Sequence, residues 1–279
     1  MKYRSSKLIK FVDACLRLVF CLPRYSSRFS RKDFTIQQHV VLLCIKVKTK
    51  QNYRDFCDLL AEMGELCKLL ELEKIPHWTT LNKAFLRLKN RVLAILLQTE
   101  NSGFLSIDAT GFDRMHASHH YAKRCKIRMK SMKTTLLIDT KNQCIVDLHC
   151  TTGRKHDSKI ILPLTSRHRF RILCADKGYD DNKVREALQD RGIIPVIPFR
   201  EMTPLHKALR NSIDMKLYHR RSLSETVNSS IKRKYGSVLY SKNWRSQFKE
   251  LILKAVVYNI DRKLSIFLIG FLQSHYFLE

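Results

Sequence analysis

The pattern of apolar residues changes near residue 104, and this change limits the possible folds more than any other feature of the chain. Residues 35–99 repeat apolar side chains at three- and four-residue spacing, as amphipathic helices do. Three β-rich segments follow, at residues 104–110, 133–140 and 144–151, and only three residues separate the last two, as in a hairpin. We therefore expect helices first and a sheet after them.

Helical and β-rich segments alternate after residue 151. A helical segment at 158–169 precedes a buried strand at 171–176, and a helical segment at 181–192 precedes another strand at 193–199. Three consecutive strands followed by alternating units suit a mixed sheet covered by helices. We therefore predict an α/β fold, a ribonuclease H-like mixed sheet flanked by helices, with an N-terminal all-helical region.

Three regions are expected along the chain. Residues 1–100 should form a helical region, residues 101–262 the sheet domain, and residues 263–279 a C-terminal helical tail. The short helices and the basic helix of the first region resemble a helix-turn-helix DNA-binding arrangement, although any small helical bundle gives the same pattern. The apolar runs at 8–22 and 264–273 are interrupted or too short to span a membrane, so both are expected to be core helices.

The charge of the chain points to a polyanionic partner. There are 52 Lys and Arg against 25 Asp and Glu, a formal net charge of +27. Nucleic acid commonly relieves such an excess, because cation contacts release its condensed counterions. An anionic membrane surface, or a merely basic protein of the ribosomal type, is the alternative. Nine cysteines without a CxxC pair indicate reduced thiols in a cytoplasmic protein.

Two predicted strands end in aspartate, Asp108 after FLSI and Asp176 after RILCA. Open α/β sheets place ligand sites at such strand ends. If the first and fourth strands are neighbours, the two carboxylates repel each other, and a divalent cation would resolve the conflict. A two-metal site typically needs a third acid, and Glu225 is the only acid between Asp214 and Glu250.

A structural explanation competes for every one of these acids. A lone aspartate at a strand end more often caps a helix or forms a turn than binds a metal. Other acids near the predicted strands are possible site residues or helix caps, namely Asp113, Asp139, Asp147, Asp180 and Asp181. The hypothesis of a metal site therefore depends on the combination of acids and on the basic chain.

Cations surround the expected site in two segments. If residues 218–232 form one helix, four polar side chains share a stripe, Tyr218, Arg221, Glu225 and Lys232, and the opposite side carries Leu223, Val227 and Ile231. In KRCKIRMK, cations alternate with neutral residues, so on a strand they could follow a phosphate backbone: Lys123, Arg124, Lys126, Arg128 and Lys130. The alternative for this segment is an edge strand that its charge protects from aggregation.

These residues resemble the DDE transposases of prokaryotic insertion sequences. The family signature around the third acid is Y-x2-R-x3-E-x6-K, which here is Tyr218, Arg221, Glu225 and Lys232 with every spacing intact. The contexts FLSIDATG and ADKGYDD of the first two acids are typical, and GRKHDSK at 153–159 is like the segment that precedes the second. The resemblance covers about residues 104–262.

The resemblance implies a catalytic domain that uses two Mg²⁺ or Mn²⁺ ions to cut terminal inverted repeats and to join the freed 3′ hydroxyl to target DNA. Asp108 would bridge both ions, while Asp176 and Glu225 would each hold one. Tyr218, Arg221 and Lys232 would contact the double-stranded DNA end. A homodimer in the synaptic complex, without membrane contact, and a nucleoid-associated location in the cytoplasm are also implied.

The spacing between the second and the third acid differs from that in some of these transposases. Asp176 and Glu225 are 225 − 176 = 49 residues apart, too short for the large β insertion that some of these transposases carry there. Two other functions remain open from the residues: a host nuclease on the same fold, and a nucleic-acid-binding protein without catalysis.

Overall fold

The computed structural model describes residues 6–115, 124, 131–151, 156–200 and 214–276. The chain divides into two compact units, one formed by Met1–Leu96 with Lys249–Glu279 and one by Leu97–Phe248. The last helix, α13 (Trp244–Tyr276), is continuous across the division. Residues 249–262, which we expected to belong to the sheet domain, therefore cluster with the helical unit.

The first unit is helical, as the periodicity of residues 35–99 predicts. Within it α2 contacts α1 and α5, and α3 contacts α4 and α5. After Pro76 the chain forms two helices, because Leu88 leaves the helical conformation, and the His77 side chain caps the first of them. The helices are α1 (Lys7–Val19), α2 (Ile36–Thr49), α3 (Tyr53–Glu62), α4 (Gly64–Leu69), α5 (Trp78–Arg87) and α6 (Asn90–Leu97), the last of which ends in the second unit.

The two apolar terminal runs differ in burial. In α1 the side chains of Phe11, Val12, Cys15 and Val19 are buried, so this helix is a core element as expected. In α13 Ile266 and Phe267 are 38% and 72% exposed, so the expectation of a core helix is wrong for the described part of the second run. No helix within the described ranges is long and apolar enough to cross a lipid bilayer.

The second unit contains a mixed sheet of six strands among the described residues, in the order β3-β2-β1-β4-β5 with β6 beside the far end of β1. The central strand β1 pairs antiparallel with β2 and parallel with β4, which confirms the predicted ribonuclease H-like arrangement. The sequence did not reveal β6. The strands are β1 (Phe104–Arg114), β2 (Met132–Asp139), β3 (Ile145–Thr151), β4 (Ile172–Cys174), β5 (Ile194–Val196) and β6 (Val238–Leu239).

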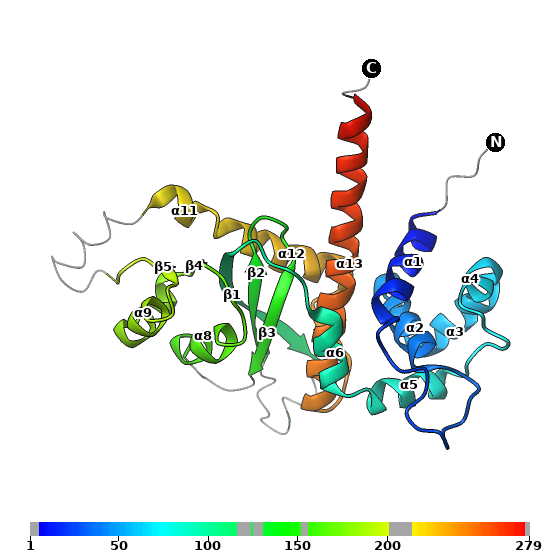
Figure 1. The fold of residues 1–279 in the computed structure, drawn as a ribbon. Helices are drawn as coiled ribbons and strands as arrows, with labels where there is room; N and C mark the ends of the chain where they lie inside the picture. Colours follow the sequence, from blue (N-terminus) through cyan, green and yellow to red (C-terminus); the bar gives the residue numbers. More distant parts are fainter. Residues whose placement is uncertain (1–5, 116–123, 125–130, 152–155, 201–213, 277–279) are drawn as a thin grey trace. The chain divides into compact units, whose positions relative to one another are not determined.

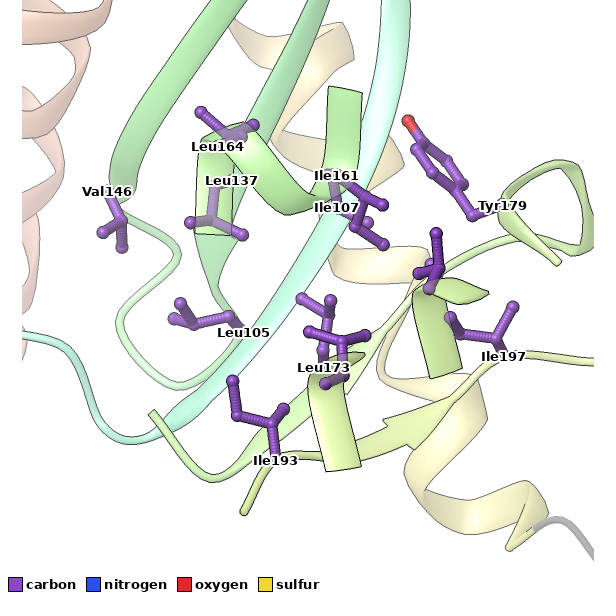
Figure 2. Close-up of a cluster of buried hydrophobic side chains, with 13 residues drawn as sticks. Leu105, Ile107, Leu137, Val146, Ile161, Leu164, Leu173, Tyr179, Ile193 and Ile197 are labelled. Atoms are coloured by element: carbon purple, nitrogen blue, oxygen red, sulfur yellow. The ribbon is translucent and has the colours of Figure 1, made fainter. Parts of the chain in front are cut away.

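Helices cover both faces of this sheet (Figure 1). On one face Leu105, Ile107 and Leu173 form a buried cluster with residues of α8 (Ser158–Thr165) and α9 (Asn182–Gln189), as Figure 2 shows. On the other face Phe104 and Cys174 contact α11 (Met215–His219). Because side chains alternate along a strand, Asp108 lies on the same face as Phe104.

Residues 218–232 do not form the single helix that we expected. Helix α11 ends at His219, and α12 (Ser222–Tyr235) begins after a tight turn in which Arg221 N donates to Tyr218 O. Val227 and Ile231 are buried, as predicted for the apolar side, and α12 contacts β1. On the other side of this turn, Leu217 of α11 packs against the sheet residues Phe104 and Cys174.

Candidate active site

The pairing of β1 with β4 places the two candidate aspartates at the same level of the sheet. Ser106 is the partner of Cys174, and Asp108 and Asp176 each follow by two residues. Asp176 comes after the end of β4, as predicted. Asp108 lies inside β1 rather than at its end, because this strand continues to Arg114 to pair with β2 and β6.

Asp108 is a half-buried carboxylate held by an amide. Asn228 on α12 donates from Nδ2 to Asp108 Oδ2 over 2.8 Å. Burial raises the pKa of Asp108, and the Glu225 carboxylate raises it further, while the Ala109 N–H, Arg221 and Asn228 oppose the shift. The neighbouring cation and hydrogen-bond donors therefore do not fully compensate the negative charge of ionised Asp108.

Glu225 is in the first turn of α12 and forms an ion pair with Arg221. Arg221 Nη2 lies 2.6 Å from Glu225 Oε1. Burial lowers the pKa of Arg221, but Tyr218, Glu225 and Asp176 outweigh that effect and leave the pKa raised. The Arg221 guanidinium also lies 5.8 Å from the centre of the Tyr218 ring, so these two residues meet despite the break between their helices.

Asp176 begins a short 3-10 turn, η1 (Lys177–Tyr179), and its Oδ1 accepts from Lys177 N over 2.7 Å. The capping role that competes with metal binding therefore applies to one of its oxygens. Beside it is a cavity of about 350 Å³ lined by Asp176, Lys177, Gly178 and Arg200. Arg200 is held there by the carbonyls of Lys177 and Gly178.

Tyr179 is a residue of this region that our sequence reasoning did not select. Its side chain is 2% exposed. Burial raises the pKa of Tyr179, and the carboxylates of Asp157, Asp108 and Asp176 raise it further. Asp157 in turn lies 2.5 Å from Lys133 Nζ. The signal available in the sequence was a tyrosine three residues after the second predicted acid, in ADKGYDD.

Asn228 was also missed, although the sequence contained a signal for it. It lies between the buried residues Val227 and Ile231 and is itself 6% exposed. A polar residue on the apolar side of an amphipathic helix usually has a specific partner. Here that partner is Asp108, which is 120 positions away in the chain.

The chemistry of the donors fits a hard divalent cation. The three candidate acids and the Asn228 amide offer only oxygen ligands, which Mg²⁺ prefers. Asn228 Oδ1 is buried without a hydrogen-bond partner among the described residues. Across those residues, however, no three His, Cys, Asp or Glu side chains are placed to hold one ion together. The acids are engaged by Asn228, Lys177 and Arg221 instead.

Most of the other acids that we considered have structural partners. Asp139 is fully buried and accepts from Ser102 and from the turn that follows it. Asp113 is exposed on β1. The remaining three bind basic side chains or cap a helix: Asp147 with Arg167 and His168, Asp180 with Arg185, and Asp181 at the start of α9.

The candidate DNA-binding cations are only partly described. Lys232 Nζ lies 5.5 Å from the centre of the Phe112 ring, four residues beyond Asp108 on β1. Arg124 is exposed. It has a helical conformation, so the expectation of a strand is wrong at this residue. The other four cations of the segment lie outside the described residues: Lys123, Lys126, Arg128 and Lys130.

Two comparisons with known proteins agree with this architecture. The family model of the transposase DDE domain matches residues 100–260, a range that includes Asp108, Asp176 and Glu225. A cryo-EM structure of the piggyBac transposase synaptic complex with hairpin DNA has a similar fold, with a TM-score of 0.51 and 12% sequence identity. That similarity covers 94% of this chain and 73% of the other. A search of curated protein sequences gave no match.

Proposed function

Because this chain belongs to the transposase DDE domain family and is therefore a transposase, we propose that it cuts the terminal inverted repeats of a mobile element and joins the freed 3′ hydroxyls to target DNA. We assign the element to the prokaryotic insertion sequences. The observation that supports the proposal is the convergence of β1, β4 and α12. Asp108 and Asp176 each follow a paired residue of adjacent strands by two positions, and α12, which carries Glu225, contacts β1 through the bond from Asn228 to Asp108.

Asp108, Asp176 and Glu225 are the proposed ligands of two divalent ions, Mg²⁺ or Mn²⁺. Bound ions of this kind activate the attacking oxygen and stabilise the leaving oxygen in phosphoryl transfer. Asp108 would be one of these ligands, because its half-buried carboxylate gains from any nearby cation. Asp176 would supply a second carboxylate from the end of the adjacent strand β4, where it lines a cavity together with Arg200.

Arg221 would link DNA binding to the release of Glu225. In the structure, Arg221 Nη2 lies 2.6 Å from Glu225 Oε1. A DNA phosphate also offers arginine two oxygen acceptors that match the fork of the guanidinium. When a phosphate takes over the guanidinium, the Glu225 carboxylate becomes available to the metal site.

The proposed partner is double-stranded DNA, both as element ends and as target. The net charge of +27 and the hairpin DNA of the piggyBac synaptic complex support this assignment. Contacts with the DNA end are assigned to Tyr218, Arg221 and Lys232 and to the basic segment around Arg124. We also propose that residues 1–100 bind DNA, that residues 101–262 catalyse, and that residues 263–279 form a tail. Because transposition joins two ends, we expect a homodimer in the synaptic complex.

The direct test is cleavage of a DNA that carries the ends of the element. Purified full chain with Mg²⁺ should cut this DNA, Asp176→Ala should not, and the exposed control Asp190→Ala should cut like the wild type. Cleavage that survives Asp176→Ala refutes the metal assignment. Cleavage that ignores the end sequence would indicate a host nuclease, and DNA binding without metal-dependent cleavage would indicate a non-catalytic protein. Inverted repeats flanked by a direct duplication around the gene would independently support the proposal.

A further inference from the structure

Asn228 occupies a position where an apolar residue would suffice for packing. It lies on the side of α12 that faces β1, next to the fully buried Val227, and it is 6% exposed. Burial of an amide costs free energy unless its donors and acceptors are satisfied. The presence of an amide here therefore requires an explanation other than packing.

The amide is only half satisfied, and the satisfied half contacts Asp108. Nδ2 donates to Asp108 Oδ2 over 2.8 Å, whereas Oδ1 is buried with no hydrogen-bond donor among the described residues. A side chain placed for stability alone would be expected to use both ends of its amide. The bond to Asp108 is the specific interaction that this side chain makes.

Asn228 also follows Glu225 by three residues on α12, so one helical turn connects the amide to the candidate third acid. The hydrogen bond from Asn228 to Asp108 therefore holds the rotamer of the Asp108 side chain. It also sets the distance from β1 to α12, the helix that carries Glu225. Both decide whether the two carboxylates can reach the same ion.

We propose that Asn228 is a positioning residue that holds Asp108 in the orientation required to bind a divalent cation together with Glu225. The proposal depends on the function proposed above, since it assumes that these acids are metal ligands. Residues that hydrogen-bond a metal ligand typically change metal affinity or activity by about 10- to 100-fold when they are replaced. An effect of that size is expected on Mn²⁺ binding even when no DNA is present.

The experiment compares two changes at Asn228 with one at its neighbour. Asn228→Leu keeps a side chain branched at Cγ and removes the donor, and Asn228→Ala removes the donor together with the side chain beyond Cβ. Val227→Ala removes buried volume but keeps the donor. Mn²⁺ binding to the full chain is measured by electron paramagnetic resonance without DNA, folding by circular dichroism, and DNA cleavage as a function of Mn²⁺ concentration.

Both Asn228 variants should bind Mn²⁺ about 10- to 100-fold more weakly and should need correspondingly more Mn²⁺ for cleavage, with an unchanged KM for DNA. Val227→Ala should stay within about threefold of the wild type, whatever its effect on thermal stability. A purely structural role predicts the reverse, with normal binding in Asn228→Leu and a loss in Val227→Ala.

The outcomes separate this inference from the proposed function. Normal Mn²⁺ affinity in Asn228→Leu and Asn228→Ala overturns the inference even if the wild type cuts DNA. Weakened Mn²⁺ binding in the Asn228 variants supports it even if the wild type fails to cut the element ends, in which case the proposed reaction is wrong. A wild-type chain without affinity for Mn²⁺ overturns the inference as well.

Discussion

Arg221 and Glu225 form an ion pair across one turn of α12, with 2.6 Å between Nη2 and Oε1. The pair joins two members of the predicted stripe that we had assigned to different tasks, DNA contact and metal binding. Arg221 is the more buried partner, with 20% of its side chain exposed against 56% for Glu225. The guanidinium is therefore the fixed member of the pair, and the carboxylate is the member that can move.

The change Glu225→Gln should abolish cleavage and preserve DNA binding. It removes the charge that a metal ligand needs and also frees Arg221 for a phosphate, so affinity for DNA should be equal or higher. Loss of one metal ligand should reduce cleavage by ~10³-fold or more, since a metal contributes several kcal/mol to the transition state. Gel assays of cleavage and binding on the same preparation measure both effects. The control is Glu186→Gln, the same change at an exposed position of α9. Full cleavage by Glu225→Gln would remove Glu225 from the site.

A second prediction concerns stability and follows from the burial of Asp108. Because burial raises the pKa of Asp108 above its ordinary value of about 4, the folded state binds this proton more tightly than the unfolded state. The contribution of Asp108 to the free energy of unfolding is therefore fully present below pH ~4. It is lost as the pH rises through the pKa that Asp108 has in the folded state.

The change Asp108→Asn should therefore raise the Tm at pH 7, by an amount on the order of a few degrees, and the gain should disappear below pH ~4. Thermal unfolding in EDTA across this pH range measures the effect. Asp113→Asn, at an exposed position of the same strand, should leave the Tm unchanged at every pH. A lower Tm for Asp108→Asn at pH 7 would mean that the carboxylate stabilises the fold, contrary to this interpretation.

The arrangement of the sheet was predictable because it depends on local patterns. The β-rich segments identified the strands, and their order with the helices suggested the ribonuclease H-like sheet. Adjacency of the first and fourth strands was only a condition of the predicted site, and the pairing of β1 with β4 meets it and brings Asp108 and Asp176 level. The burial of Val227 and Ile231 followed from helical spacing in the same way.

The features that were missed depend on contacts between distant segments. No Gly or Pro interrupts residues 215–235, so nothing local marks the break between α11 and α12. That break accompanies the packing of Leu217 against the sheet residues Phe104 and Cys174. The partner of Asn228 is 120 residues away, and β6 is a two-residue strand whose pairing with β1 gives no periodic signal.

Asp139 provides a test of which buried acid is structural. We expect Asp139→Ala to lower the free energy of unfolding by roughly 3 kcal/mol or more, because each buried donor left without an acceptor costs about 1–3 kcal/mol. Its carboxylate accepts from Ser102 N at 2.6 Å, Ser102 Oγ at 2.7 Å and Lys141 N at 2.8 Å. Urea denaturation measures the loss, with Asp190→Ala as the exposed control. Normal stability combined with loss of Mn²⁺ binding would instead identify Asp139 as a metal ligand.

Lys232 provides a test of the DNA path away from the acids. It lies seven residues, about two helical turns, beyond Glu225 on α12, and its Nζ is 5.5 Å from the Phe112 ring on β1. A phosphate backbone that reaches the acids could therefore continue along α12 to this ammonium. If Lys232 contacts one phosphate, its removal should weaken binding without regard to the base sequence.

We expect Lys232→Ala to weaken DNA binding by roughly tenfold at low salt, since a hydrogen bond to a charged group contributes about 1.5–3 kcal/mol. The plot of log K against log salt concentration should also become less steep by about 0.9, the value for one phosphate contact. Fluorescence anisotropy at several salt concentrations measures both quantities. Lys141→Ala is the control, because it removes the same charge from the β2–β3 turn. This turn lies beside Leu105, at the opposite end of β1 from Phe112. The Lys141 variant should therefore change neither the affinity for DNA nor the salt dependence. Equal effects of the two variants would show that only the total charge matters, and that α12 does not guide the DNA.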